Sequence, residues 1–231
     1  MTPTNAESAT GPPGATDSAA VTTAAVISAG LVAILRARSA EHFPAIAETL
    51  IDVGVRVIEV TLTAPDALTT ITALTANLGD AAIVGAGTVM TADQAEACVD
   101  AGAAFVASPT ASPDVIAAAR IAGIAAYPGA LTPTEIVTAH RFGAPMVKLF
   151  PASAVPPRFI TDLHGPCPEI PIMPTGGIAI DDITTWLRAG AAVVGLGTPL
   201  IGAATADGAD RALAERARRA LAAVQESRGR R

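Results

Sequence analysis

The only lysine of the chain, Lys148, is the residue whose type most plainly suggests chemistry. The other fourteen of the 15 basic residues are arginine, so a surface charge here would not require lysine. Period-two alternation in the apolar run 145–151 places Met146, Lys148 and Phe150 on one face of a strand. Burial there favours an uncharged amine, the nucleophile that attacks a carbonyl carbon. Lys148 is therefore a candidate Schiff-base residue. The alternatives are a lysine that reaches solvent and one that only forms an ion pair.

Glu59 is the candidate partner of this amine. In the run 57–61, alternation puts Val57, Glu59 and Thr61 on one face of a second strand, so the carboxylate also points inward. Two roles fit an interior carboxylate near a lysine: an ion pair that stabilises the interior, or a proton shuttle. Imine chemistry needs such a shuttle, because carbinolamine formation, dehydration and proton transfer at carbon all move protons. The catalytic role is the one we predict.

Two glycine-containing turns suggest an anion site. Residues 174–178 contain Gly176 and Gly177, and residues 195–198 end in Gly197 and Thr198. Such turns bring backbone N–H groups close to a phosphate. Each pair alone fits an ordinary tight turn, but both follow the last two predicted strands, where barrels often bind phosphate. The two turns together predict a phosphate site.

Arg36 and Thr88 also fall at predicted strand ends. Arg36 ends the first strand and can bind a carboxylate through a bidentate contact. Residues 85–88 end the third strand, where two glycines leave room for a small substrate and Thr88 supplies a hydroxyl. The neighbouring Arg38 is interpreted as a surface loop charge.

The elements that must position these residues repeat along the chain. Short Val/Ile/Leu-rich runs alternate with longer alanine-rich stretches, and the runs begin near residues 31, 57, 83, 105, 125, 146, 171 and 193. This spacing fits one strand, one helix and two short loops, and eight such units close a (β/α)8 TIM barrel. Glycines mark the expected helix ends: Gly54, Gly102, Gly123, Gly143 and Gly190. An open doubly wound sheet is the alternative, but no Gly-rich loop follows the first strand.

Composition predicts one domain and a small-molecule substrate. We expect a disordered tail over 1–25, the barrel over 26–225 and an Arg-rich tail over 226–231. The net charge is −6 and most basic residues are scattered, which argues against a nucleic-acid surface. No targeting leader or membrane-length apolar stretch is recognised, so a cytoplasmic protein is expected.

Metal and disulfide chemistry are not predicted. The two cysteines, Cys98 and Cys167, have no paired spacing and are expected to be reduced, inert thiols. The histidines His42, His140 and His164 form no ligand pattern and are interpreted as surface or packing residues. No metal and no cofactor are therefore expected.

In this order, these residues resemble the family of 2-keto-3-deoxy-6-phosphogluconate and 4-hydroxy-2-oxoglutarate aldolases, over about residues 31–200. The most specific segments are 54–62, 83–89, 148–152 and 174–178. The resemblance implies a class I aldolase without a cofactor, usually a homotrimer.

The resemblance also implies roles for individual residues. Lys148 matches the Schiff-base lysine and Glu59 the acid/base glutamate, while Arg36 and Thr88 match groups around the substrate carboxylate. Pro109 and Phe150 are expected to line the pocket. The resemblance also implies that four residues of the two turns bind phosphate: Gly176, Gly177, Gly197 and Thr198.

One departure concerns the substrate. Members that act on the phosphogluconate usually carry arginine where this chain has Thr63. The segments 62–65 and 151–154 look closer to the phosphogalactonate branch. Both phosphorylated epimers and 4-hydroxy-2-oxoglutarate stay open as substrates. The remaining alternatives are a phosphate-binding barrel enzyme of another class and a non-catalytic sugar-acid-binding barrel.

Overall fold

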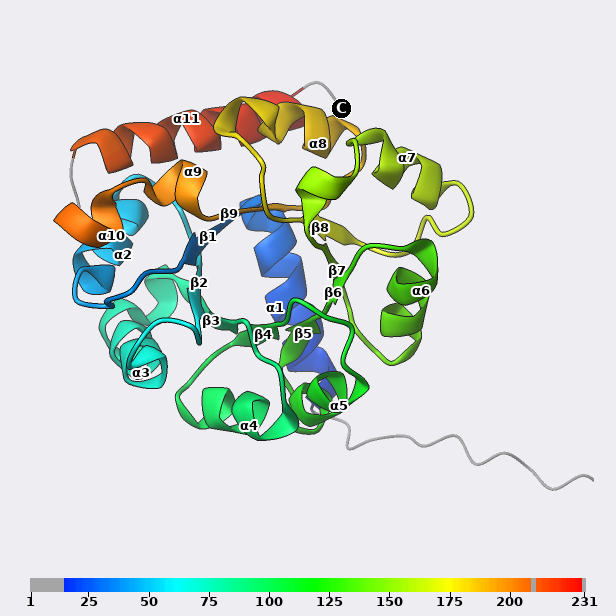
Figure 1. Ribbon diagram of the computed structural model, residues 1–231, viewed down its shortest axis with the longest axis horizontal. Helices are drawn as coiled ribbons and strands as arrows, with labels where there is room; N and C mark the ends of the chain where they lie inside the picture. The colour runs from blue at the N-terminus through cyan, green and yellow to red at the C-terminus, as the bar shows by residue number, and fades with distance from the viewer. Residues whose placement is uncertain (1–14, 209–210, 230–231) are drawn as a thin grey trace, which may run out of the picture.

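The computed structural model describes residues 15–208 and 211–229, in which parallel strands surround a common centre and helices cover them from outside (Figure 1). The strands are β1 (Leu31–Leu35), β2 (Val57–Thr61), β3 (Ile83–Gly87), β4 (Phe105–Ala107), β5 (Ala125–Tyr127), β6 (Gly129–Ala130), β7 (Val147–Leu149), β8 (Ile172–Pro174) and β9 (Val194–Leu196). They form a six-stranded sheet in the order β5-β4-β3-β2-β1-β9 and a three-stranded sheet in the order β6-β7-β8. The predicted parallel α/β architecture is confirmed.

The two sheets meet at both of their edges. β5 and β6 are separated only by Pro128, and a parallel bridge pairs Thr175, just after β8, with Gly195 of β9. The predicted starts of the first five strands match the structure, and those of the last three precede the observed starts by one residue. Because the strands run parallel to one another, their C-terminal ends all lie on one side of the molecule.

The helices are α1 (Ala15–Ala29), α2 (Phe43–Asp52), α3 (Ala67–Leu78), α4 (Ala92–Asp100), α5 (Pro113–Ile121), α6 (Pro133–Arg141), α7 (Arg158–His164), α8 (Ile183–Arg188), α9 (Thr198–Ile201), α10 (Ala204–Asp207) and α11 (Arg211–Arg228). Short 3-10 turns cover η1 (Gly79–Ala81), η2 (Ala152–Ala154) and η3 (Ile180–Asp182). The five predicted stop glycines follow helices and have positive φ, for example 105° at Gly54 and 109° at Gly190, where residues with a Cβ are strained. Within the described ranges, no helix is both long and apolar enough to span a membrane.

Two apolar layers reflect the alternation seen in the sequence. Ile58 and Val60 of β2 and Val147 and Leu149 of β7 pack in the layer between strands and helices. The inner layer lies among the strands and contains Val32, Val57, Phe105, Tyr127, Met146, Met173 and Val193. This partition confirms the prediction that Met146 and Lys148 face inward while their neighbours face the helices.

The first helix corrects the predicted N-terminal tail. The tail was expected over 1–25, but α1 begins at Ala15, while residues 1–14 lie outside the described part. Val26 is fully buried in the inner layer, and Thr23 Oγ1 lies 3.2 Å from Tyr127 Oη. Burial raises the pKa of Tyr127 to about 12. Packing on the strands, which a weakly patterned sequence does not reveal, orders this helix.

The C-terminal tail was also predicted too long. α11 extends to Arg228, beyond the expected end at residue 225. The Arg228 guanidinium donates to the carbonyls of Ser28 and Ile27 at 2.6 and 2.7 Å, which ties the end of α11 to the end of α1. Residues 230–231 lie outside the described ranges.

The two thiols differ in burial, which gives a testable prediction. Cys98 is fully buried in α4, and desolvation raises its pKa to about 11, whereas Cys167 is partly exposed. Because the thiolate is the reactive form, a thiol reagent at pH 8 should label folded protein with about one equivalent, at Cys167. Cys98 should react only after denaturation. A Cys167→Ser variant that is labelled rapidly without denaturant would contradict this assignment.

Candidate active site

Lys148 and Glu59 meet in the interior although 89 positions separate them in sequence. Lys148 Nζ lies 3.2 Å from Glu59 Oε1 and 3.4 Å from Oε2. The lysine is 5% exposed and the glutamate 1%, so their ion pair is sheltered from water. Lys148 belongs to β7 of the smaller sheet and Glu59 to β2 of the larger one. Their side chains therefore reach toward each other across the space that the strands enclose.

Glycines of β3 make the room that the glutamate needs. A Cβ on Gly87, the partner of Thr61 in the ladder, would overlap the Glu59 carboxylate. A Cβ on Gly85 would overlap the Phe105 ring. The sequence predicts that these glycines leave space for a substrate. Here they make space for the interior glutamate and for an inner-layer ring.

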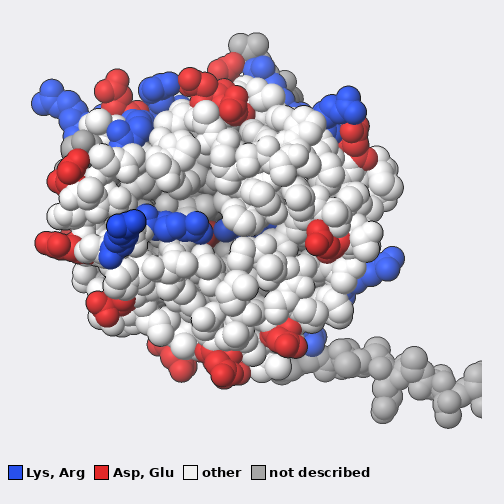
Figure 2. Space-filling view, viewed as in Figure 1, with Lys and Arg blue, Asp and Glu red and all other residues white. Residues whose placement is uncertain are grey.

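A cavity of about 370 Å³ opens above Lys148 at the C-terminal strand ends. Figure 2 shows this face hollowed near its centre, with Lys and Arg side chains running into the hollow. Seven residues predicted for the site line it: Arg36, Lys148, Phe150, Gly176, Gly177, Gly197 and Thr198. The lining also includes Ile34, Thr175, Ile178 and Pro199, which were not assigned roles. In the sequence, their position at strand ends or in the two glycine turns was the signal that could have identified them as lining residues.

Three predicted residues lie outside the cavity lining. Glu59 is buried beside Lys148. Thr88 accepts a hydrogen bond of 3.4 Å from Arg36 Nη2, so it adjoins the cavity through that arginine. Pro109 is partly buried, and a Cβ on Gly129 would overlap its carbonyl group, which places Pro109 against β6. The structure thus brings Arg36 and Thr88 together but does not place Pro109 in the wall.

Thr88 adopts a backbone conformation that β-branched residues rarely take. Its φ is +60°, in the left-handed region. Such strain costs on the order of 1–3 kcal/mol and concentrates at functional sites. In this conformation, the Thr88 hydroxyl oxygen lies 3.4 Å from Arg36 Nη2.

The two glycine turns are fixed by their neighbours. Gly176 and Gly177 have φ of +91° and +77°, and a Cβ on Gly177 would lie 2.6 Å from Ser153 Cβ. The backbone N–H groups of Ala152 and Ser153 donate to the carbonyls of Thr175 and Gly176 at 2.9 and 3.0 Å. The turn after β8 is therefore locked against the chain that follows Lys148.

Thr63, at the position of the family arginine, is exposed and close to Thr61. Their hydroxyl oxygens are 3.0 Å apart, and Thr61 Oγ1 donates to the Leu35 carbonyl at 3.1 Å. Since that bond uses the single hydroxyl proton of Thr61, Thr63 is the donor to Thr61. The hydroxyl pair supports the end of β1, next to Arg36, but supplies no positive charge.

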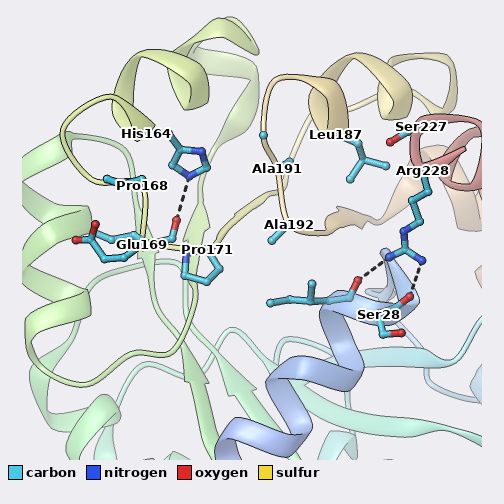
Figure 3. A pocket seen from close by; sticks show the side chains of 13 residues that line it. Ser28, His164, Pro168, Glu169, Pro171, Leu187, Ala191, Ala192, Ser227 and Arg228 are labelled. Atoms are coloured by element: carbon cyan, nitrogen blue, oxygen red, sulfur yellow. Dashed lines mark hydrogen bonds between the residues drawn. The ribbon is translucent and has the colours of Figure 1, made fainter. Parts of the chain in front are cut away.

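A second cavity, of about 400 Å³, lies at the other ends of the strands (Figure 3). His164, Glu169 and Arg228 supply charged or titratable groups to its wall. His164 Nε2 contacts the Ile170 carbonyl at 3.1 Å, and Arg228 is bound to the end of α1. Because His164 and Arg228 serve local backbone contacts, the cavity above Lys148 is the better candidate for an active site.

Metal ligands do not gather in the described part of the chain. Among residues 15–208 and 211–229, no group of three or more His, Cys, Asp or Glu is placed to hold a metal ion. The nucleophile and carboxylate form an arrangement that suits imine chemistry.

Comparison with known proteins agrees with this geometry. The family model "KDPG and KHG aldolase" matches residues 23–215. The 2-dehydro-3-deoxy-6-phosphogalactonate aldolase of Escherichia coli K12 is 34% identical over 171 residues, 74% of this chain and 83% of the relative. A solved structure described as native KDPGal has a TM-score of 0.81 and 32% identity, covering 86% of this chain and 96% of its own.

A Legionella pneumophila KDPG aldolase has also been solved with pyruvate captured as a covalent carbinolamine. It has a TM-score of 0.74 and 27% identity, covering 88% of this chain and 96% of its own. From the family model and the shared identity, the chain belongs to the KDPG and KHG aldolase family and is an enzyme of the lyase class.

Proposed function

We propose that the protein is a class I aldolase that cleaves a 2-keto-3-deoxy-6-phospho-sugar acid, of gluconate or galactonate type, to pyruvate and glyceraldehyde 3-phosphate. The observation that carries the proposal is the buried amine of Lys148, 3.2 Å from the Glu59 carboxylate and part of the wall of a cavity of about 370 Å³. The family and the carbinolamine captured in a relative support the same chemistry.

In the proposed mechanism, Glu59 takes up one proton from the Lys148 ammonium group, and the resulting amine Nζ attacks the C2 carbonyl of the substrate. A second Nζ proton moves to the carbonyl oxygen, which gives the carbinolamine hydroxyl. Glu59 returns a proton to the carbinolamine hydroxyl, which leaves as water, and an iminium forms. Glu59 then accepts the C4 hydroxyl proton, directly or through a water. The C3–C4 bond breaks, and its electron pair moves into the iminium to give an enamine. Protonation at C3 and hydrolysis release pyruvate and regenerate the amine.

Residues in the cavity wall and beside it are assigned to recognition. Arg36 and Thr88, in contact with each other, bind the substrate carboxylate. The phosphate lies against the backbone N–H groups of Gly176, Gly177 and Gly197 and the hydroxyl of Thr198. Phe150, whose ring centroid is 5.8 Å from Lys148 Nζ, covers the amine, and Pro109 supports the adjoining strand ends.

We infer that the strands form one closed (β/α)8 barrel in a single domain. β5 and β6 act as one interrupted strand, and the Thr175–Gly195 bridge joins the sheets at the other edge. The family resemblance supports a homotrimeric enzyme without a cofactor, and the cytoplasmic location stays a prediction from the sequence. Sedimentation equilibrium tests the trimer: a mass of one chain at micromolar concentration would exclude it.

Substrate choice is tested by pyruvate release in a coupled assay. The substrates are both phosphorylated epimers and 4-hydroxy-2-oxoglutarate, which yields pyruvate and glyoxylate. At least one phosphorylated epimer should give a higher kcat/KM than the hydroxyoxoglutarate. The reverse order would favour the second candidate, a 4-hydroxy-2-oxoglutarate aldolase, which the family description includes. Absence of pyruvate from all three would favour a different barrel enzyme, or a binding protein if calorimetry still detects a ligand.

Gly87→Ala should disable the enzyme without touching a reacting group. The new Cβ would overlap the Glu59 carboxylate and displace it from Lys148. A displacement of this kind lowers kcat about 100-fold, and overpacking destabilises the fold by about 1–3 kcal/mol. Steady-state kinetics and thermal unfolding measure both effects.

Gly165→Ala is the matched control. Gly165 has a helical φ of −56°, and its new Cβ would make only an ordinary 3.4 Å contact with the Asp162 carbonyl. Near-normal kcat is expected for this control. A fully active Gly87→Ala enzyme would show that the position of Glu59 is not critical.

A further inference from the structure

The short helix α9 joins the cavity to the outer helices. Gly197 and Thr198, just before and at its start, line the cavity, and the helix ends at Ile201, followed by Gly202. One turn of helix has little stability of its own, because nucleation is unfavourable. Its last carbonyl groups also lack partners within the helix. The orientation of Gly197 and Thr198 therefore depends on what holds the other end of α9.

Arg216 of α11 holds that end. Its Nε donates to the Leu200 carbonyl at 2.7 Å, and its Nη2 donates to the Ile201 carbonyl at 2.8 Å. The planar guanidinium presents two donors in a fixed geometry that a lysine cannot reproduce. Gly202 has φ +58°, and a Cβ there would lie 2.7 Å from Nη2. Glycine at 202 thus leaves the space that the guanidinium occupies.

α11 is a firm support for this contact. Leu213, Ala217 and Ala220 are fully buried, one turn or less from Arg216, and the helix runs for 18 residues. Figure 1 shows α11 lying alongside α8 and close to α9 on the outside of the strands. Arg219, on the same helix, instead pairs with Asp181 at 2.8 Å, where both side chains are largely exposed. Arg219 therefore serves as a matched control for Arg216, because it does not contact α9.

We propose that Arg216 is a positioning residue for phosphate recognition. It fixes the C-terminal end of α9 and thereby holds Gly197 and Thr198 at the phosphate end of the cavity. Arg216 contacts carbonyls at the opposite end of α9 from these two residues. The inference rests on the proposed function for the presence of a phosphate group on the substrate. Under this inference, phosphate recognition depends on Arg216, whereas imine chemistry at Lys148 does not depend on it.

The test compares Arg216→Ala, Arg216→Lys and Gly202→Ala with the control Arg219→Ala. For Arg216→Ala, KM for the phosphorylated substrate and the inhibition constant of inorganic phosphate should both rise about tenfold, because displaced donors bind more weakly. The kcat/KM for the same sugar acid without phosphate should change less than about twofold. Arg216→Lys should fall between wild type and Arg216→Ala, and Gly202→Ala should resemble Arg216→Ala. Arg219→Ala should match wild type.

The outcomes distinguish this inference from the proposed function. Equal loss on substrates with and without phosphate in Arg216→Ala, or an unchanged phosphate inhibition constant, would overturn the positioning role. If wild type releases no pyruvate from any substrate, the proposed function fails. Calorimetry with inorganic phosphate then tests Arg216 alone. Equal affinity in wild type and Arg216→Ala, including no binding by either, would overturn the inference.

Discussion

Lys148→Arg should reduce aldol cleavage to background. Arginine retains the positive charge beside Glu59, but its guanidinium does not form the imine that the reaction requires. Loss of a covalent nucleophile lowers kcat by roughly 10⁴- to 10⁶-fold. Pyruvate release at saturating substrate, followed for hours at high enzyme concentration, measures this decrease.

The controls for Lys148 concern folding. Lys148→Met leaves the buried Glu59 carboxylate without its partner, and breaking a buried ion pair costs about 3–5 kcal/mol. Lys148→Arg, which retains a cation, should therefore melt at a higher temperature than Lys148→Met. Because the chain has no other lysine, no neighbouring amine of this type can substitute. Turnover by Lys148→Arg above about 1% of wild type would exclude Lys148 as the nucleophile.

Glu59→Gln should distinguish the role of Glu59 as a proton shuttle from its role in the ion pair with Lys148. The amide has nearly the same shape but does not accept and return protons, so kcat should fall about 10²- to 10⁴-fold. Imine formation with pyruvate should still be detectable, although slower. Stopped-flow absorbance and single-turnover pyruvate release measure the two steps.

Glu135→Gln is the control for this substitution. Glu135 lies at the start of α6, where backbone N–H groups of Leu131 and Thr132 donate to its carboxylate and lower its pKa. It is not among the residues that line the cavity, so the kcat of this variant should stay near wild type. A Glu59→Gln enzyme with normal kcat and reduced thermal stability would limit Glu59 to the structural ion pair.

Alternation within strands was the most reliable signal in the sequence. It placed Lys148 and Glu59 on inward faces, because side chains of a strand must point to opposite sides. The five stop glycines fixed the helix ends for a similarly local reason, the positive φ that follows a helix. Local geometry therefore predicted the strands, the helix ends and the inward faces of Lys148 and Glu59.

Features decided by packing between distant segments were missed. Residues 15–25 of α1 were predicted as part of a tail, because nothing in their own sequence shows that Thr23 contacts Tyr127 of the inner layer. Pro109 matched a family motif, yet its exact place depends on the close approach of Gly129. The role of Arg216 likewise depends on Leu200 and Ile201 being adjacent to it in space. Such contacts follow from tertiary structure, not from spacing along the chain.

The most direct measurement is borohydride reduction of the protein in the presence of pyruvate, followed by peptide mass spectrometry. If the sheltered amine attacks the keto group, the reduced pyruvate adduct appears on the peptide that contains Lys148 and is absent from Lys148→Arg. An adduct on any other peptide, or an unmodified Lys148 peptide under conditions of full turnover, would contradict the account.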